Sequence, residues 1–157
     1  MAPTFVFSGR WRVPATVAEV AGVLVDLEHY PRWWPEVRAV ARLDDDTARV
    51  LCRSILPYTL DLVLRAERRE PPVLRVGVDG DLAGTVAFEL VPAGAGTEVR
   101  LSQEVVLAHR SLAVVAGPAG PLLRWNHRRM MAGFARGLVD RLGEAGPGQP
   151  RAAMAAS

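Results

Sequence analysis

Residues 121–142 have the sequence PLLRWNHRRMMAGFARGLVDRL. Apolar side chains recur in it at steps of three and four, the spacing that places them on one face of an α-helix. That face carries Leu123, His127, Met130, Met131, Phe134 and Leu138. The opposite side carries Trp125, Arg128, Arg129, Ala132 and Arg136, and Asn126 falls at the edge of the apolar face. We therefore expect a long amphipathic helix with one buried face and one solvated, basic face.

Proline and glycine indicate the ends of this helix. Pro118 and Pro121 suit its start, because the first turn of a helix tolerates residues without an N–H donor. Gly143 follows Leu142 and marks the end of the helix. Residues 144–157 are rich in proline, glycine and alanine without periodicity, which predicts a disordered tail. We therefore expect a single domain at 1–143. A chain of 157 residues is also of the length that favours one domain.

Upstream of the helix, apolar and polar side chains alternate, as they do in strands with one buried face. Turn signals divide this region at 44–46, 70–72, 78–81 and 92–96, and the clearest strand is 58–67. Asp79-Gly80 suits a two-residue hairpin turn between strands 73–79 and 81–90. The last strand starts at Thr97, and its apolar face carries Val99, Leu101, Gln103, Val105 and Leu107. The pattern predicts an antiparallel meander.

The N-terminal part of the chain predicts a strand, a helix and a corner. Residues 5–13 alternate as a strand, and Thr16 and Glu19 have the spacing of a helix-capping box. The following sequence HYPRWWPEV, residues 29–37, has prolines on both sides of Trp33 and Trp34. Because proline restricts the backbone on either side of it, we expect a short helical turn between bends.

These elements describe an α+β domain in which a curved antiparallel sheet wraps its apolar face around the long C-terminal helix, with two short helices after the first strand. Three segments carry a family resemblance: VPATVAEVAGVLVDLEHYPRWWPEV (13–37), GDLAGTVAFELVPAGAGTEVRL (80–101) and PLLRWNHRRMMAGFARGLVDRL (121–142). The chain resembles the helix-grip (SRPBCC) superfamily of START domains and Bet v 1-like plant proteins, particularly the bacterial polyketide cyclase/dehydrase-like group. The resemblance implies a cavity between sheet and helix for an apolar or aromatic small molecule. Some members of this group catalyse cyclisation or dehydration, others bind or carry a ligand, and a few act through protein partners.

Composition excludes several classes of function. The chain has no lysine, which excludes a Schiff-base lysine and attachment of pyridoxal phosphate. Cys52 is the only cysteine, so no internal disulfide can form, and the three histidines are scattered, so we expect no metal and no cofactor. The formal charge of +2 gives no reason to expect nucleic acid as a partner. The sequence shows no signal peptide or membrane span, so we expect a cytoplasmic protein, either a monomer or a homodimer.

Two polar side chains occupy apolar positions. His127 lies near the centre of the apolar helix face, where it is either a hydrogen-bonded core residue or a group with general acid/base capacity facing a ligand. Gln103 lies in the apolar phase of the last strand, where its amide is either satisfied by backbone or directed into the same cavity.

Further candidates for ligand contact follow from the same reasoning. They are Trp33, Tyr58, His109, Leu123, Asn126, Met130 and Phe134. For the aromatic and methionine side chains, packing in a plain core is the alternative interpretation. For His109, exposure near the end of its strand is the alternative.

Three functions are compatible with the sequence. The first is binding of an apolar small molecule, aromatic, polyketide-like or acyl, in the internal cavity. The second is a cofactor-independent cyclase or dehydratase that uses His127 as general acid/base, with Gln103, Asn126 or Tyr58 orienting a carbonyl. The third is a partner-binding module that uses the outer arginine face, in particular Arg128 and Arg136.

Overall fold

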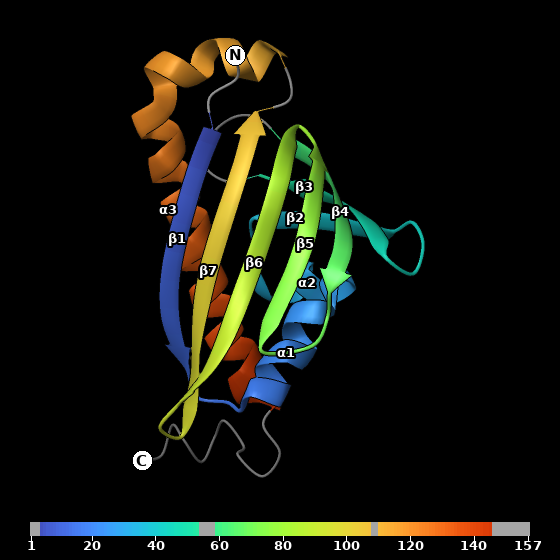
Figure 1. The fold of residues 1–157 in the computed structure, drawn as a ribbon, viewed down its shortest axis with the longest axis vertical. Coiled ribbons are helices and arrows are strands. Elements are labelled where there is room, and N and C mark those ends of the chain that lie inside the picture. The colour runs from blue at the N-terminus through green and yellow to red at the C-terminus, as the bar shows by residue number, and fades with distance from the viewer. Residues whose placement is uncertain (1–3, 54–58, 108–109, 146–157) are drawn as a thin grey trace.

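The computed structural model describes residues 4–53, 59–107 and 110–145, with the backbone alone for 110–120 and 144–145. Within these residues, seven strands form one antiparallel sheet in the order β1-β7-β6-β5-β4-β3-β2 (Figure 1). The strands are β1 (Thr4–Val13), β2 (Val37–Arg42), β3 (Thr47–Cys52), β4 (Leu60–Arg68), β5 (Val73–Gly80), β6 (Leu82–Ala93) and β7 (Gly96–Leu107).

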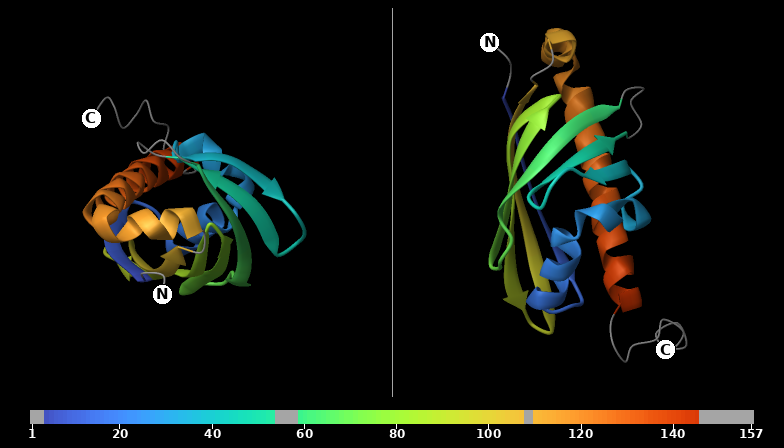
Figure 2. Two further views of the ribbon diagram at one scale, coloured as in Figure 1. Left: turned by 90° about the horizontal axis from the view of Figure 1, so that it is seen from above. Right: turned by 90° about the vertical axis from the view of Figure 1, so that its right-hand side faces the viewer.

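The helices lie on the concave side of this sheet. They are α1 (Val17–Val25), the 3-10 helix η1 (Leu27–His29), α2 (Tyr30–Trp33) and the long α3 (Arg110–Ala145). Figure 2 shows the sheet curving around α3, with α1 and α2 on the same side. The expected helix-grip arrangement is therefore confirmed.

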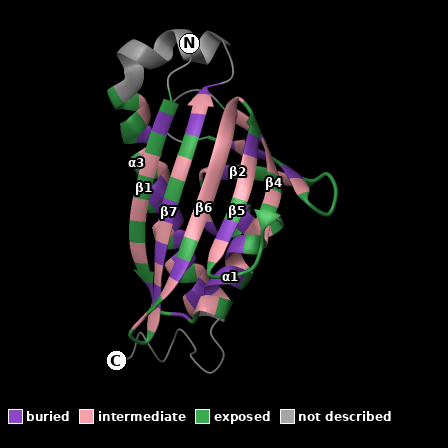
Figure 3. Cartoon of the chain, in the orientation of Figure 1, coloured by how far each residue is buried: buried purple, intermediate pink, exposed green. Residues whose placement is uncertain are grey.

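The strand phases follow the predicted alternation. In β7, Val99, Leu101 and Val105 are buried, whereas Ser102 and Glu104 are exposed. Figure 3 shows the same alternation along β1. β1 pairs with β7 in the register that sets Phe7 opposite Gln103. The inward-facing side chains of the first and last strands therefore lie next to each other.

The start of α1 is fixed by the predicted capping box. The Thr16 hydroxyl accepts the backbone N–H of Glu19 at 3.2 Å, and the Glu19 carboxylate accepts the Thr16 backbone N–H at 3.1 Å. Two N–H groups that have no partner within the helix are thereby satisfied. The 3-10 helix and the four-residue α2 that follow match the expected short helical turn between bends.

The predicted pairing of the strands around Asp79-Gly80 is confirmed, since β5 and β6 form an antiparallel hairpin, but the predicted two-residue turn is wrong. β5 continues to Gly80 because Gly80 still pairs with Leu62 of β4, whereas the last pair between β5 and β6 is Val78 with Gly84. Gly80 has a φ of +105°, and a Cβ there would collide with the backbone carbonyl of Asp61, so the glycine permits close approach of two strands. A two-residue hairpin turn occurs between β6 and β7 instead, where Gly94 has a φ of +60°.

The predicted start of the last helix is also wrong. α3 begins at Arg110, so Pro118 and Pro121 lie within it, and its end at Ala145 is two residues beyond Gly143. Proline in a helix interior removes a backbone hydrogen bond and bends the helix. Figure 1 shows the first part of α3 crossing the end of the sheet at an angle to the remainder. On the remainder, Arg128, Arg129 and Arg136 are exposed, as expected.

An aromatic corner joins α2 to α3. The indole N–H of Trp34 donates to the backbone carbonyl of Met130 at 2.9 Å. The Trp33 and Trp34 rings lie 5.7 and 5.0 Å from the Phe134 ring, between centroids. A Cβ at Gly137 would overlap the Trp33 backbone carbonyl, so a glycine at this position lets the two helices approach closely.

Candidate ligand-binding cavity

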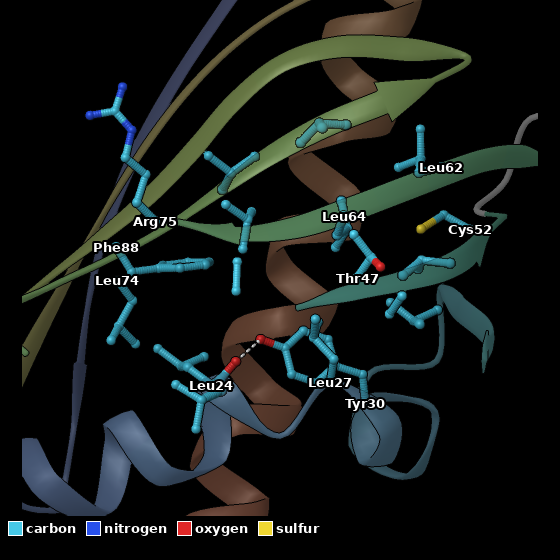
Figure 4. A pocket seen from close by; sticks show the side chains of 18 of the residues that line it. Leu24, Leu27, Tyr30, Thr47, Cys52, Leu62, Leu64, Leu74, Arg75 and Phe88 are labelled. Carbon is cyan, nitrogen blue, oxygen red and sulfur yellow. Dashed lines mark hydrogen bonds between the residues drawn. The ribbon is translucent and has the colours of Figure 1, made fainter. Parts of the chain in front are cut away.

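A cavity of about 490 Å³ lies between the concave face of the sheet, α3 and the α1–η1 segment. Its wall is built from alternate, inward-facing side chains of β3 to β7, most of them leucine or valine, together with Met130 and Met131 of α3. Figure 4 shows Leu62, Leu64, Leu74 and Phe88 around this space, with Leu24, Leu27 and Tyr30 on the opposite side. Apolar clefts of this size accommodate small organic molecules.

One polar pair forms part of the wall. His127 of α3 and Gln103 of β7 both line the cavity, and His127 Nε2 lies 3.0 Å from Gln103 Oε1. Because an amide oxygen can only accept, the imidazole Nε2–H is the donor and the ring lone pair resides on Nδ1. The imidazole also stacks on Phe7 of β1, with 3.6 Å between ring centroids and 13° between planes. The register that sets Phe7 opposite Gln103 brings all three side chains together.

Burial determines the charge of His127. Removal of the ring from water disfavours the imidazolium and lowers its pKa to about 4. The side chain is therefore neutral at pH 7, where it can donate a hydrogen bond through Nε2 or accept a proton at Nδ1, but cannot act as a general acid from a resident imidazolium.

Two further groups with acidic protons line the cavity and stay protonated. The Tyr30 hydroxyl donates to the Leu24 carbonyl at 2.5 Å, and burial, assisted by the charge of Asp26, raises the pKa of this tyrosine well above its ordinary value. Burial likewise raises the pKa of the Cys52 thiol to about 12. A protonated thiol is a weak nucleophile, so Cys52 contributes an apolar contact to the wall.

The mouth of the cavity is charged. It lies where η1, the β2–β3 turn and the end of β4 meet. The Asp44 carboxylate accepts the backbone N–H groups of Asp46 and Thr47, each at 2.8 Å. A side-chain hydrogen bond from Thr47, together with these backbone bonds, lowers the pKa of Asp44. These bonds fix the β2–β3 turn beside the opening.

Three predicted ligand contacts belong to the cavity wall: Gln103, His127 and Met130. Tyr58 and His109 lie outside the described residues. The roles of all of them in binding or catalysis stay predictions.

The other four predicted contacts lie outside the cavity wall. Trp33 is buried against α3, and its neighbour Trp34 lines the cavity instead. Phe134 is fully buried in the core and stacks on Phe88. Leu123 packs against a second cluster that contains Phe5. Asn126 is buried, and its Oδ1 has no hydrogen-bond partner among the residues that the structure describes.

Sequence reasoning missed Trp34, Tyr30, Cys52 and the charged mouth as parts of the cavity. The β-strand phase of residues 47–52 could have identified Cys52, because its side chain lies on the same face as Val50 and Ala48, which also line the cavity. No local signal distinguishes Trp33 from Trp34, because α2 is a single turn.

Residues 4–143 match the family described as polyketide cyclase / dehydrase and lipid transport. The chain belongs to this family. No curated protein matches the chain.

Three solved structures with the same fold each match most of this chain. A protein from Thermus thermophilus superposes with a TM-score of 0.77 at 19% identity, covering 90% of this chain and 99% of its own. The Zhui aromatase/cyclase from Streptomyces sp. R1128 superposes with a TM-score of 0.72 at 16% identity, covering 88% and 93%. A START superfamily protein from Mycobacterium smegmatis superposes with a TM-score of 0.71 at 19% identity, covering 89% and 98%. At these identities the likeness shows the fold.

The length of α3 raises the question of a membrane span. Over the part of the chain that the structure describes, neither α3 nor any other helix combines the length and hydropathy that crossing a bilayer requires.

Proposed function

We propose that this polyketide cyclase/dehydrase-family protein binds an apolar small molecule, ring-containing or acyl, in the cavity between its sheet and α3. The observation that carries the proposal is the cavity of about 490 Å³ with leucine, valine and methionine walls and a neutral His127–Gln103 pair. Full burial of one large apolar contact is worth about 1.5 to 3 kcal/mol. Several such contacts support micromolar affinity, and the polar pair then orients the ligand.

The fold neighbours support this proposal. The norcoclaurine synthase of Thalictrum flavum, with a TM-score of 0.60 and 16% identity over 91% of this chain and 88% of its own, was crystallised with dopamine and hydroxybenzaldehyde. Both molecules are small and aromatic. The family description names polyketide cyclase / dehydrase and lipid transport, and lipids are apolar as well.

A thermal-shift screen with aromatic and acyl compounds tests the proposal when it is combined with a cavity-filling variant. Leu64 of β4 lines the cavity, and Val63 lies in the outward phase of the same strand. We expect hits that stabilise the wild type and the control Val63→Trp, but not Leu64→Trp, because the added indole occupies the ligand's space. Absence of any stabilising compound, or equal stabilisation of Leu64→Trp, would contradict the proposal.

The position of His127 favours a second candidate, a cyclase or dehydratase. In the folded protein the neutral imidazole has a lone pair on Nδ1 and an orienting partner in Gln103. Such an imidazole can accept a proton from a carbon adjacent to a carbonyl, and with a pKa of about 4 it does so as a weak base. The test is turnover of aromatic-forming poly-β-ketone thioesters by the wild type and by His127→Ala. Equal rates for the two folded proteins would exclude this role, whereas a loss of at least about a hundredfold would support it.

A further inference from the structure

A row of side chains on β4 leads along the cavity wall and ends in an arginine. Its members are Leu60, Leu62, Leu64, Ala66 and Arg68, all of which line the cavity. At about 3.3 Å per residue, the row is roughly 26 Å long. A β-bulge interrupts the pairing with β5 between Ala66 and Arg68, and bulges redirect the side chains next to them. The apolar wall therefore ends at a cation beside the mouth.

The other arginines that line the mouth are neutralised. Each has a carboxylate partner: Arg42 with Asp45 at 2.6 Å, Arg69 with Asp46 at 2.9 Å, and Arg75 with Glu67 at 3.2 Å. Figure 4 shows Arg75 turned away from the other lining side chains. None of these three guanidinium groups offers an unpaired charge to a ligand.

Arg68 differs from them. Among the residues whose side chains are described, no carboxylate lies within ion-pair distance of Arg68, and of the remaining residues only Glu144 is acidic. Arg68 Nε donates to the backbone carbonyl of Glu70 at 3.3 Å. This bond orients the guanidinium and uses one of its five N–H donors, so the two terminal amino groups are left for another partner.

The carboxylates of the mouth are engaged elsewhere. Asp44 is held by backbone N–H groups of its own turn, and Asp26 lies 2.7 Å from the His29 ring nitrogen. Asp45 and Asp46 pair with the arginines named above. Glu28 lies 3.9 Å from Arg42. The acidic residues of the rim thus have partners other than Arg68.

We propose that the cavity takes an amphiphilic ligand, whose apolar part lies along the β4 row and whose carboxylate is bound by Arg68 at the mouth. This inference rests on the proposed function, since it names the chemical class of the ligand for the same cavity. A planar carboxylate fits because it accepts two parallel N–H bonds from a guanidinium. Since Arg68 is exposed, the gain over a neutral ligand is modest, about threefold to fivefold in affinity.

Titration calorimetry with matched ligand pairs tests the proposal on the full chain. The probes are 2-naphthoate against 2-naphthamide, and decanoate against decanamide, with wild type, Arg68→Gln and Arg65→Gln. Arg65 is the control, because it lies on the opposite face of β4 and pairs with Asp79 at 3.2 Å. We expect the wild type and Arg65→Gln to prefer each acid about threefold to fivefold, and Arg68→Gln to lose this preference without a change in affinity for the amide. The preference should also decrease as NaCl is raised from about 0.05 to about 0.5 M.

The outcomes separate the two proposals. If acids and amides bind the wild type equally, or if Arg68→Gln keeps the preference, the carboxylate site at Arg68 is rejected while apolar binding stands. If none of the four compounds binds the wild type and the thermal-shift screen finds no other ligand, the binding function fails and the carboxylate site with it.

Discussion

Burial of His127 makes the stability of the protein depend on pH. The pKa of its imidazole is about 4 in the folded protein, against an ordinary value of 6.5. Between these values the unfolded chain binds a proton that the folded chain does not, so acidification favours unfolding. The contribution of His127 is fully present above about pH 6.5 and is lost as pH falls toward 4, at about 1.4 kcal/mol per pH unit and at most about 3 kcal/mol in total.

Replacement of His127 by phenylalanine should remove this dependence. The new ring can keep the stacking on Phe7, but it neither titrates nor bonds to Gln103. Urea unfolding of wild type and His127→Phe at pH 7, 6, 5 and 4 measures the effect, and the carboxylates common to both proteins cancel in the difference. We expect the free energy of unfolding of the wild type to fall more steeply below pH 6.5. Parallel curves for the two proteins would show that His127 is not the titrating group.

At the scale of elements, α2 and α3 depend on a glycine for their contact. A Cβ at Gly137 would overlap the Trp33 carbonyl, whereas a Cβ at Gly22 of α1 would meet no atom within 4 Å. We expect Gly137→Ala to lower the free energy of unfolding by about 1 to 3 kcal/mol, because the helices must move apart. Gly22→Ala should raise it by about 0.5 to 1 kcal/mol, because alanine restricts the unfolded chain. Chemical denaturation measures the free energy of unfolding of both variants. A Gly137→Ala variant more stable than the wild type would contradict the close packing of α2 and α3.

Helices and strands were predictable from the sequence where the residues that determine them are close together in the chain. The Thr16–Glu19 capping box and the alternation of β7 depend on neighbouring residues, and both are confirmed. The β5–β6 hairpin was predicted correctly, but its two-residue turn at Asp79-Gly80 was predicted wrongly, because Gly80 pairs with Leu62 of β4. The start of α3 was predicted wrongly because proline is expected in the first turn of a helix. In the structure the helix begins at Arg110 and continues through Pro118 and Pro121.

The cavity was only partly predictable for the same reason. His127 and Gln103 were identified because each is a polar residue in a clear apolar phase, and their meeting follows from how β7 and α3 pack. The mouth combines residues from η1, the β2–β3 turn and the end of β4. No periodicity links such segments, so the charged rim and the position of Arg68 require the three-dimensional structure.

At the scale of the molecule, Phe134 joins the sheet to the helices. It is fully buried, and its ring lies 5.5, 5.0 and 5.4 Å from the rings of Trp11, Trp34 and Phe88, between centroids. We expect Phe134→Ala to lower the free energy of unfolding by about 3 to 5 kcal/mol, because a cavity opens at the centre of the core. The control is Trp125→Ala on the exposed face of α3, which should change stability by less than about 1 kcal/mol. Comparable losses in the two variants would show that the fold is not organised around Phe134.

Because the proposed ligand lies inside the core, its binding should stabilise the whole fold. A ligand that binds only the folded state at about one hundred times its Kd raises the free energy of unfolding by about 2.7 kcal/mol. We therefore expect urea unfolding with and without the tightest compound of the screen to show this increment in wild type and in Val63→Trp. In Leu64→Trp the increment should vanish, while the stability without ligand stays equal or rises as the cavity is filled. An equal increment in Leu64→Trp would mean that the compound binds elsewhere on the molecule.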